Sequence, residues 1–460
     1  MNLNQFRPSG WLPLPLALLI AVVALASAAS AERKEKVLYS FQGIPDGAVP
    51  AGGVAFDQQG NLYGATTNGG ASNCQSLFDC GTVFELSPPA KKGDPWVETV
   101  LYIFKGVPSK DGASPFGGLV IDGSGNLYGT TGYGGAGTCL QSGTNVGCGT
   151  VYELSPPEQK GEAWTETVLH SFKGDKDGEL AWGGLLFDGA GNLYGATEFG
   201  GGYGVCNAPY YQHCGTIFEV SPPKQKGGQW TEKVLYSFRG GKDGANPNGG
   251  LVFDNKGAIY GATEYGGSTT RCPGTYFSGC GTVFKLVPAN KKGHSWTEDM
   301  VHSFTNGADG GGPNGGLIFD AKGSIYGTAG SGGTHLDGVV FRLTLSTGNH
   351  WMETVLYNFT QLSDGGEPNS GLTLDRLGNL YGTALGGTSF RGVVFRLKIP
   401  TRGRYWAFAT LYNFNGSTDG HWPEARVVSD AAGNLYGTTL GGGTGTECTN
   451  GCGTVFEVSP

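Results

Sequence analysis

The chain repeats four short patterns of hydrophobic residues in a fixed order. They are typified by "GGLVFD", "NLYGTT", "GTVFELSP" and "WxETVLYSF", and each is rich in Val, Leu, Phe or Tyr and bounded by Gly, Pro, Asp or Asn. Short segments of this alternating character predict β-strands and not helices. Copies of the second pattern stand at 61–66, 126–131, 192–197, 258–263, 324–329, 379–384 and 434–439.

The order of the patterns predicts an all-β fold. "D-x-x-G-N" lies between the first two patterns, and Asp with a positive-φ Gly is typical of a hairpin turn. Four antiparallel strands in each of seven repeats predict a seven-bladed β-propeller. The chain after the leader starts with a fourth pattern and ends with a third, "GTVFEVSP" at 453–460. We therefore expect residues 37–41 to complete the last blade, which hides the sheet edges.

The first 31 residues have the layout of a secretory signal peptide. A short segment with one Arg is followed by the apolar run "WLPLPLALLIAVVALA" and by small residues ending at Ala31. This three-part layout predicts cleavage near Ala31 and export of the mature protein. We expect no membrane span after cleavage, and residues 32–460 to form a single propeller domain. Secreted, periplasmic and surface-held locations all stay open.

Composition and charge narrow the range of partners. Hydrophobic residues make up 38% of the chain despite 85 glycines, which is enough for a core. The formal net charge is −8, and no block of Lys and Arg occurs. A mildly acidic chain without such a block does not favour nucleic acid as a partner. We expect a monomer without a cofactor.

The ten cysteines fall into five local pairs, each between a second and a third pattern. The two repeats without cysteines are also the two with a short loop at this place, as in "LGGTSFRGVVF". Long loop and cysteine pair therefore occur together, which predicts one disulfide in each long loop. A zinc site would need further Cys or His ligands that these pairs lack. The pairs are Cys74/Cys80, Cys139/Cys148, Cys206/Cys214, Cys272/Cys280 and Cys448/Cys452.

The strand order predicts which loops share a face. The loops that carry the cysteines and the "DGAxPxGG" loops that lead into the next blade should lie on one side of the ring. The "SPPxKKGxxW" connections should lie on the other side. Variable loops gathered on one side of a rigid scaffold are the usual place for ligand contact.

The repeat text resembles that of a known bacterial family. The succession "DG-x-x-P-x-x-G-L", "D-x-x-GNLYGTT", "GTVF-x-L" and "W-x-E" over residues 37–460 is similar to the choice-of-anchor tandem repeat GloVer-containing proteins. The resemblance implies an exported repeat protein and brings no established reaction. Members differ in C-terminal sorting tails, and this sequence shows none, so the resemblance leaves anchoring open.

Residues repeated in every blade are expected to serve the blade. An Asp precedes Gly in each loop between blades, and Asp-Gly is a common turn pair. A ring of such carboxylates could instead bind a cation. The residues are Asp46, Asp111, Asp177, Asp243, Asp309, Asp364 and Asp419.

Candidate binding residues are those that break the sevenfold pattern. Two adjacent blades carry Glu after "YGAT", where a cation or an acid–base pair could be held. Exposed aromatic residues beside carboxylates suit sugar stacking. Ordinary loop variation is the alternative. The candidates are Trp182, Glu198, Glu264, His335, His421 and Trp422, with Glu179, Tyr210, Tyr211 and His213 near some of them in sequence.

Two classes of function follow from these patterns. The favoured one is a non-catalytic propeller that binds an extracellular glycan or protein through its disulfide-braced face, or serves as a scaffold. The alternative is an extracellular hydrolase or lyase acting on a polysaccharide or lactone. No nucleophile elbow, phosphate loop or metal motif occurs in the sequence, so we assign no catalytic and no metal-binding residue.

Overall fold

The structure is a computed structural model of the whole chain. It describes residues 35–71, 80–159, 161–202, 206, 213–225, 227–268, 272–273, 279–289, 295–348, 350–400 and 405–459. These residues belong to one compact unit, Lys34–Pro460. Among them, no helix is long and apolar enough to cross a membrane.

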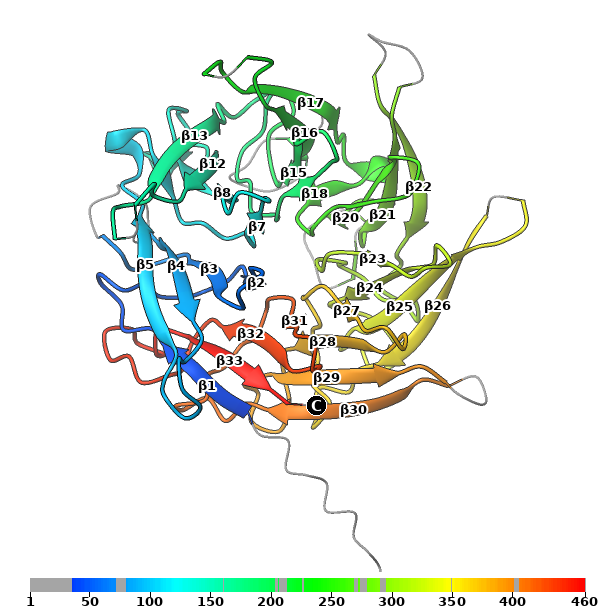
Figure 1. Cartoon of the computed structure of the whole chain (residues 1–460). Helices are drawn as coiled ribbons and strands as arrows, with labels where there is room; N and C mark the ends of the chain where they lie inside the picture. Colours follow the sequence, from blue (N-terminus) through cyan, green and yellow to red (C-terminus); the bar gives the residue numbers. More distant parts are fainter. Residues whose placement is uncertain are drawn as a thin grey trace, which may run out of the picture. The chain divides into compact units, whose positions relative to one another are not determined.

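Seven antiparallel sheets stand in a ring and form a seven-bladed β-propeller, as the repeat predicts (Figure 1). From the inner to the outer strand, the first three blades are β2 (Val54–Phe56), β3 (Leu62–Thr66), β4 (Thr82–Ser87) and β5 (Val97–Ile103); β7 (Val120–Ile121), β8 (Leu127–Thr131), β12 (Thr150–Ser155) and β13 (Thr165–Ser171); and β14 (Leu186–Phe187), β15 (Leu193–Thr197), β16 (Thr216–Ser221) and β17 (Thr231–Ser237).

The other four blades follow the same order. They are β19 (Val252–Phe253), β20 (Ile259–Tyr265), β21 (Thr282–Val287) and β22 (Thr297–Ser303), with the extra strand β18 (Ala245–Pro247) on β20; β23 (Ile318–Phe319), β24 (Ile325–Ala329), β25 (Val339–Leu345) and β26 (Trp351–Asn358); β27 (Thr373–Leu374), β28 (Leu380–Ala384), β29 (Val393–Lys398) and β30 (Ala407–Asn413); and β31 (Val428–Ser429), β32 (Leu435–Thr439), β33 (Thr454–Val458) and β1 (Glu35–Ser40).

Short elements lie in the loops between these strands. They are the ribbons β6 (Gly112–Ala113) with β9 (Tyr133–Gly134) and β10 (Leu140–Gln141) with β11 (Thr144–Asn145), and the single 3₁₀ turns η1 (Val107–Ser109) and η2 (Gly241–Asp243). No sequence pattern predicts these two turns. They are too short to change the all-β class.

The first strand closes the ring, as predicted. β1 pairs antiparallel with β33, with Val37 opposite Phe456 and a bulge before Tyr39. The strand spans Glu35–Ser40, and Phe41 continues the contact by donating its N–H to Gly453 O at 3.0 Å. Strands from the two ends of the chain therefore share the last blade.

Each pair of neighbouring blades is held by two aromatic rings and one glycine. Phe41 at the end of β1 meets Phe84 of β4 edge to face, with the ring centroids 5.0 Å apart. A Cβ on Gly64 would stand 2.4 Å from Phe84 Cζ. The Gly of "NLYGTT" is therefore required because the tip of the third-strand ring of the same blade approaches it closely. The equivalent ring pairs are Phe104–Tyr152, Phe172–Phe218, Phe238–Phe284, Phe304–Phe341, Phe359–Phe395 and Phe414–Phe456.

The repeated Asp residues organise turns in the structure. Asp57, after β2, accepts the N–H groups of Gln59 and Asn61 at 2.8 and 2.9 Å. Asp111 accepts Tyr102 Oη at 2.9 Å and the Lys105 N–H at 3.0 Å within its own loop. The oxygens of both carboxylates thus accept hydrogen bonds from nearby donors, as expected of turn residues.

Four of the five predicted disulfides lie in the described residues and are formed. They are Cys139–Cys148, Cys206–Cys214, Cys272–Cys280 and Cys448–Cys452. The fifth prediction involves Cys74, which lies outside the described residues. Disulfides of this number are typical of an oxidising, extracellular environment.

Candidate ligand-binding site

The loop that enters each blade turns at a residue with left-handed backbone. In the second blade this residue is Ser114, with φ 54°, and its N–H donates to Cys80 O of the preceding blade at 2.9 Å. This conformation costs a residue other than Gly roughly 1–2 kcal/mol, and the bond between blades helps to hold it. The equivalent residues are Val49, Ser114, Leu180, Asn246, Gly312, Glu367 and Trp422.

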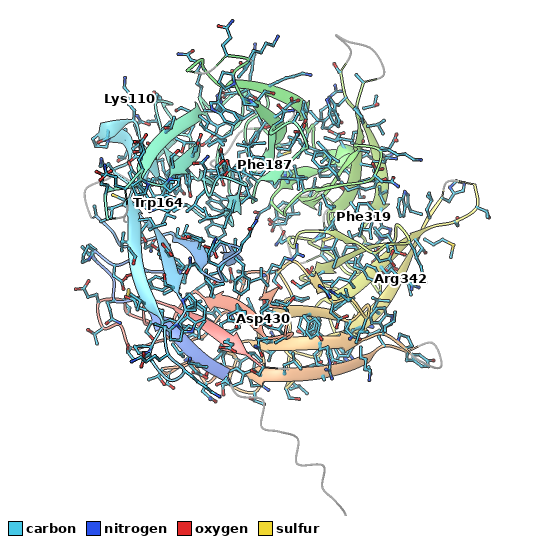
Figure 2. The ribbon with its side chains drawn as sticks, in the orientation of Figure 1. Lys110, Trp164, Phe187, Phe319, Arg342 and Asp430 are labelled. Carbon is cyan, nitrogen blue, oxygen red and sulfur yellow. A yellow bond between two sulfur atoms is a disulfide. The ribbon has the colours of Figure 1, made fainter. Side chains whose placement is uncertain are left out.

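Two residues after this turn, one side chain of each blade reaches the entrance of the central channel. These seven side chains line a cavity of about 250 Å³ together with glycines of the inner strands. The inner strands end near the centre of the ring, as the labelled Phe187, Phe319 and Asp430 show in comparison with Lys110 (Figure 2). We call the seven the mouth ring: Ala51, Phe116, Trp182, Asn248, Asn314, Asn369 and Glu424.

Two adjacent members of the mouth ring form an aromatic platform. The rings of Phe116 and Trp182 stack with centroids 5.1 Å apart and an angle of 21° between their planes. Both residues are only partly buried. Trp182 lies against Gly132 of the preceding blade, where a Cβ would come within 2.1 Å of its Nε1. The platform therefore depends on a glycine at a position that holds Glu198 and Glu264 in the next two blades.

Three amides continue the ring on consecutive blades. Asn314 is hydrogen-bonded to Glu264, and its buried Oδ1 has no partner among the described residues. Asn369 lies over Gly330, where a Cβ would be 2.3 Å from Oδ1. Amides offer both donors and acceptors, so with Asn248 they present mixed polarity beside the platform.

Glu198 and Glu264 come close enough to interact, although they lie on different blades. Burial, with a contribution from the charge of Glu264, raises the pKa of Glu198 to about 8. Burial also raises the pKa of Glu264, while hydrogen bonds from Tyr265 and Asn314 oppose that rise. Glu198 Oε2 is buried without a partner among the described residues, so the protonated form of Glu198 is favoured near neutral pH.

A second cavity, of about 510 Å³, adjoins the amides. Glu264, Asn314 and Asn369 line it, together with Glu367. Asn314 and Asn369 also line the channel cavity, so the two hollows share these residues. Burial and the charge of Glu367 raise the pKa of Glu424 in the mouth ring. Carboxyl groups thus stand on both sides of the amides.

The two histidine candidates differ in burial. His421 is 2% exposed and meets Trp422 edge to face, with centroids 4.4 Å apart. Burial lowers the pKa of His421, and the charge of Arg391 lowers it further. Trp422 occupies the left-handed turn position of its blade. His335 is exposed and lines neither cavity.

Several residues of this site were not among the sequence candidates. Phe116, the three amides and Glu424 each follow a Pro and stand directly before the first strand pattern. Comparing that one position across the seven repeats would have found them. Glu179 is paired with Phe199 on the loop face, and His213 lies near Asp175. Tyr210 and Tyr211 lie outside the described residues.

Another hollow opens on the opposite face, between the first two blades. It has a volume of about 590 Å³ and is lined by turn residues after β2 and β7 and by Trp164. Trp164 packs against Tyr63 of the preceding blade, with ring centroids 6.4 Å apart. Repeated residues dominate this lining, so it has the character of a groove between blades.

The arrangement at the mouth suits a polar ligand with an apolar face. Stacked aromatic rings offer a flat surface, and amides and carboxyl groups offer directional hydrogen bonds. In the ranges that the structure covers, no three His, Cys, Asp or Glu side chains are placed to hold a metal ion.

Comparisons with solved structures return proteins of low sequence identity. The aldose sugar dehydrogenase of Streptomyces coelicolor, in its PQQ-bound form, is 13% identical with a TM-score of 0.43, over 93% of this chain and 98% of that one. A putative glucose dehydrogenase of Thermus thermophilus is 15% identical with a TM-score of 0.40, over 93% and 100%. A gluconolactonase of Xanthomonas campestris is 15% identical with a TM-score of 0.39, over 78% and 90%.

The family comparison covers most of the chain. No curated protein matches the sequence. The model of the Gloeobacter/Verrucomicrobia repeat matches residues 136–385 and 269–460. The two matches overlap and together reach the end of the sequence, in agreement with the tandem repeat. The chain therefore belongs to the Gloeobacter/Verrucomicrobia repeat family.

Proposed function

We propose that this protein is an exported, non-catalytic propeller that binds a glycan at the mouth of its central channel. The observation that carries the proposal is the stacked pair Phe116–Trp182, which is continuous with the amides of the mouth ring. Sugar rings have an apolar face that stacks on aromatic side chains and hydroxyl groups that bond to amides and carboxyl groups. Both kinds of partner are present here at once.

Symmetry supports this location. Six of the seven mouth-ring side chains are larger than Ala, yet they are not alike, while a Gly pair directly follows them in five of the seven blades. A ring built only for packing has no need of an aromatic pair, three amides and a carboxyl group on successive blades. Variation confined to one concave surface is typical of a binding site.

Export is part of the proposal. The four disulfides fit an oxidising environment, and the leader at residues 1–31 has the pattern of a signal peptide. A glycan outside the cytoplasm is therefore the partner we favour. A protein partner at the same face is the competing outcome of the test below.

A glycan array with the purified mature protein tests the proposal. We expect binding to one class of oligosaccharide, with at least a tenfold loss in Trp182→Ala. Trp164→Ala is the matched control, because Trp164 is also partly buried but lies in the hollow of the opposite face. Equal binding by both variants, or no binding by the wild type, would refute the proposal. Repeating the array with EDTA shows whether a cation contributes.

Glycan cleavage is a second candidate, favoured by one observation. Glu198, whose pKa is raised to about 8, lies near Glu264, whose pKa burial also raises, and two neighbouring carboxyl groups can divide the roles of general acid and base. Incubation of the array ligand followed by measurement of new reducing or unsaturated ends tests it. Cleavage by the wild type that is lost in Glu198→Gln, with binding retained, would make the protein an enzyme.

A further inference from the structure

One charged side chain of the inner strands has no counterpart in the other blades. Arg426 stands at the second Gly of the "GGLVFD" pattern in the seventh blade. Its equivalents in the other six blades are Gly53, Gly118, Gly184, Gly250, Gly316 and Gly371.

The inner strands approach one another closely at this level. A Cβ on Gly371 would stand 3.3 Å from the Gly316 backbone, and one on Gly53 would stand 3.1 Å from Ala425 Cβ. Gly371 lines the channel cavity, and its Cβ would be 3.5 Å from Arg426 Cδ. Arg426 is therefore the one residue at this level of the ring that adds a side chain.

The Arg426 side chain is anchored by a second exception to the repeat. Nε donates to Thr373 Oγ1 at 3.2 Å, and Thr373 in turn donates to the carbonyl of Val427. Most other blades have Val, Leu or Ile at the position of Thr373. The hydroxyl thus fixes one edge of the guanidinium while the other edge is left available.

The charge of Arg426 is uncompensated. Among the described residues, none forms an ion pair with it, and its terminal amino groups make no hydrogen bond there beyond the Nε contact. Protein surrounds the group closely enough that burial lowers the pKa of Arg426, yet the residue retains solvent exposure. A guanidinium that is surrounded by protein and remains accessible to solvent is consistent with a position in the lumen of the channel.

We propose that Arg426 makes the central channel a binding site for an oxyanion, and for a carboxylate in particular. The guanidinium presents a planar fork of N–H donors whose geometry matches the two oxygens of a carboxylate. A Lys at this position would not provide the same bidentate contact. The anion can arrive as a free carboxylate or as the acid group of a uronic sugar, and both have the same recognition chemistry.

The test measures binding of sodium acetate, glucuronate and glucose to the mature protein at low ionic strength, by calorimetry and by thermal shift. We expect glucuronate or acetate to bind and to raise the melting temperature, and glucose to have no effect at the same concentration. Arg426→Gly should weaken anion binding roughly tenfold or more, the scale of about 1.4 kcal/mol for a lost charge-assisted contact. The other six blades carry Gly at this position, so the variant should fold.

Two further variants serve as controls for this experiment. Arg376→Gln removes an exposed Arg on the turn between β27 and β28 and should leave anion binding unchanged. Arg426→Gln covers the case in which Arg426→Gly loses its cooperative thermal transition. Binding of glucuronate without acetate would assign the site to sugar acids, and binding of both would assign it to carboxylates in general. Absence of anion binding in the wild type, or undiminished binding in both Arg426 variants, would overturn the inference.

Discussion

The indole of Trp182 lies on the backbone of Gly132, the residue that follows "LYGTT" in the preceding blade. A Cβ at Gly132 would stand 2.1 Å from Trp182 Nε1. The next two blades carry Glu198 and Glu264 at the same position. The residue after this strand pattern lies beside the mouth-ring side chain of the next blade. Gly at this position allows the aromatic platform, and Glu at the same position in the next two blades gives the carboxyl pair.

Gly132→Ala should displace Trp182 and disturb the platform. Overpacking of this kind typically costs about 1–3 kcal/mol, and we expect a lower free energy of unfolding together with weaker glycan binding. Gly123→Ala is the control, because nothing lies within 4 Å of a Cβ at that site. Chemical denaturation followed by fluorescence measures the difference. Identical midpoints for both variants would show that the indole has room to move.

Glu198→Gln should change how stability depends on pH. The pKa of Glu198 is raised to about 8 in the folded protein, against about 4.3 for an unperturbed Glu. The folded state therefore holds a proton that the unfolded state has lost between these values. Its contribution to stability is full below a pH of about 4.3 and is lost as the pH rises through about 8.

The variant removes this term from the pH dependence. Over that pH range, the wild type should lose up to about 1.4 kcal/mol per pH unit more than Glu198→Gln, the slope for one proton. Urea unfolding at several pH values between about 4.5 and 8.5 gives the slopes. Glu153→Gln is a control on a half-buried carboxylate of β12. Parallel curves for wild type and Glu198→Gln would place the proton elsewhere.

The disulfides should differ in how much they contribute to the stability of the folded protein. Cys139 and Cys148 are nine residues apart, and Cys448 and Cys452 are four apart. Loop-closure entropy gives roughly 2.7 and 2.1 kcal/mol for loops of these sizes. Paired substitutions by Ser, followed by thermal unfolding, should therefore lower stability in this order. A larger effect for the shorter loop would show that local strain or packing outweighs chain entropy.

Ring closure through the first strand should be as strong as the junctions within the chain. Phe41 and Phe359 are both 0% exposed and contact the third-strand ring of the next blade, Phe84 and Phe395, at similar distances. Truncation of a buried Phe to Ala costs about 3–5 kcal/mol, and we expect the two variants to lose similar amounts. A much smaller loss in Phe41→Ala would mean that the ring opens at the last blade.

The blades could be predicted from sequence because the residues that each blade requires recur in seven repeats. The Gly under Phe84, the Asp in the turn at Asp57 and the closing strand at Val37 all leave a signal in one short pattern. The disulfides described by the structure follow from the same logic, since a long loop and two cysteines occur together.

The candidate site could be predicted only in part. Trp182, Glu198 and Glu264 stand out because they break the repeat beside a recognised pattern. Asn314 and Asn369 were missed because they occupy a variable position of the loops between blades, between the turn and the first strand. Both amides line two cavities because a left-handed turn precedes each of them. A residue such as Glu367 gives no indication in the sequence that its backbone is left-handed.

The most direct test of glycan binding at the channel mouth is fluorine NMR of protein labelled with 5-fluorotryptophan. The signals of Trp182 and Trp164 would be assigned from single Phe substitutions, and the oligosaccharide selected on the array would then be added. We expect the Trp182 signal to shift with saturation while the Trp164 signal stays in place. A shift of Trp164 with an unmoved Trp182 would put the ligand on the opposite face and contradict the proposed site.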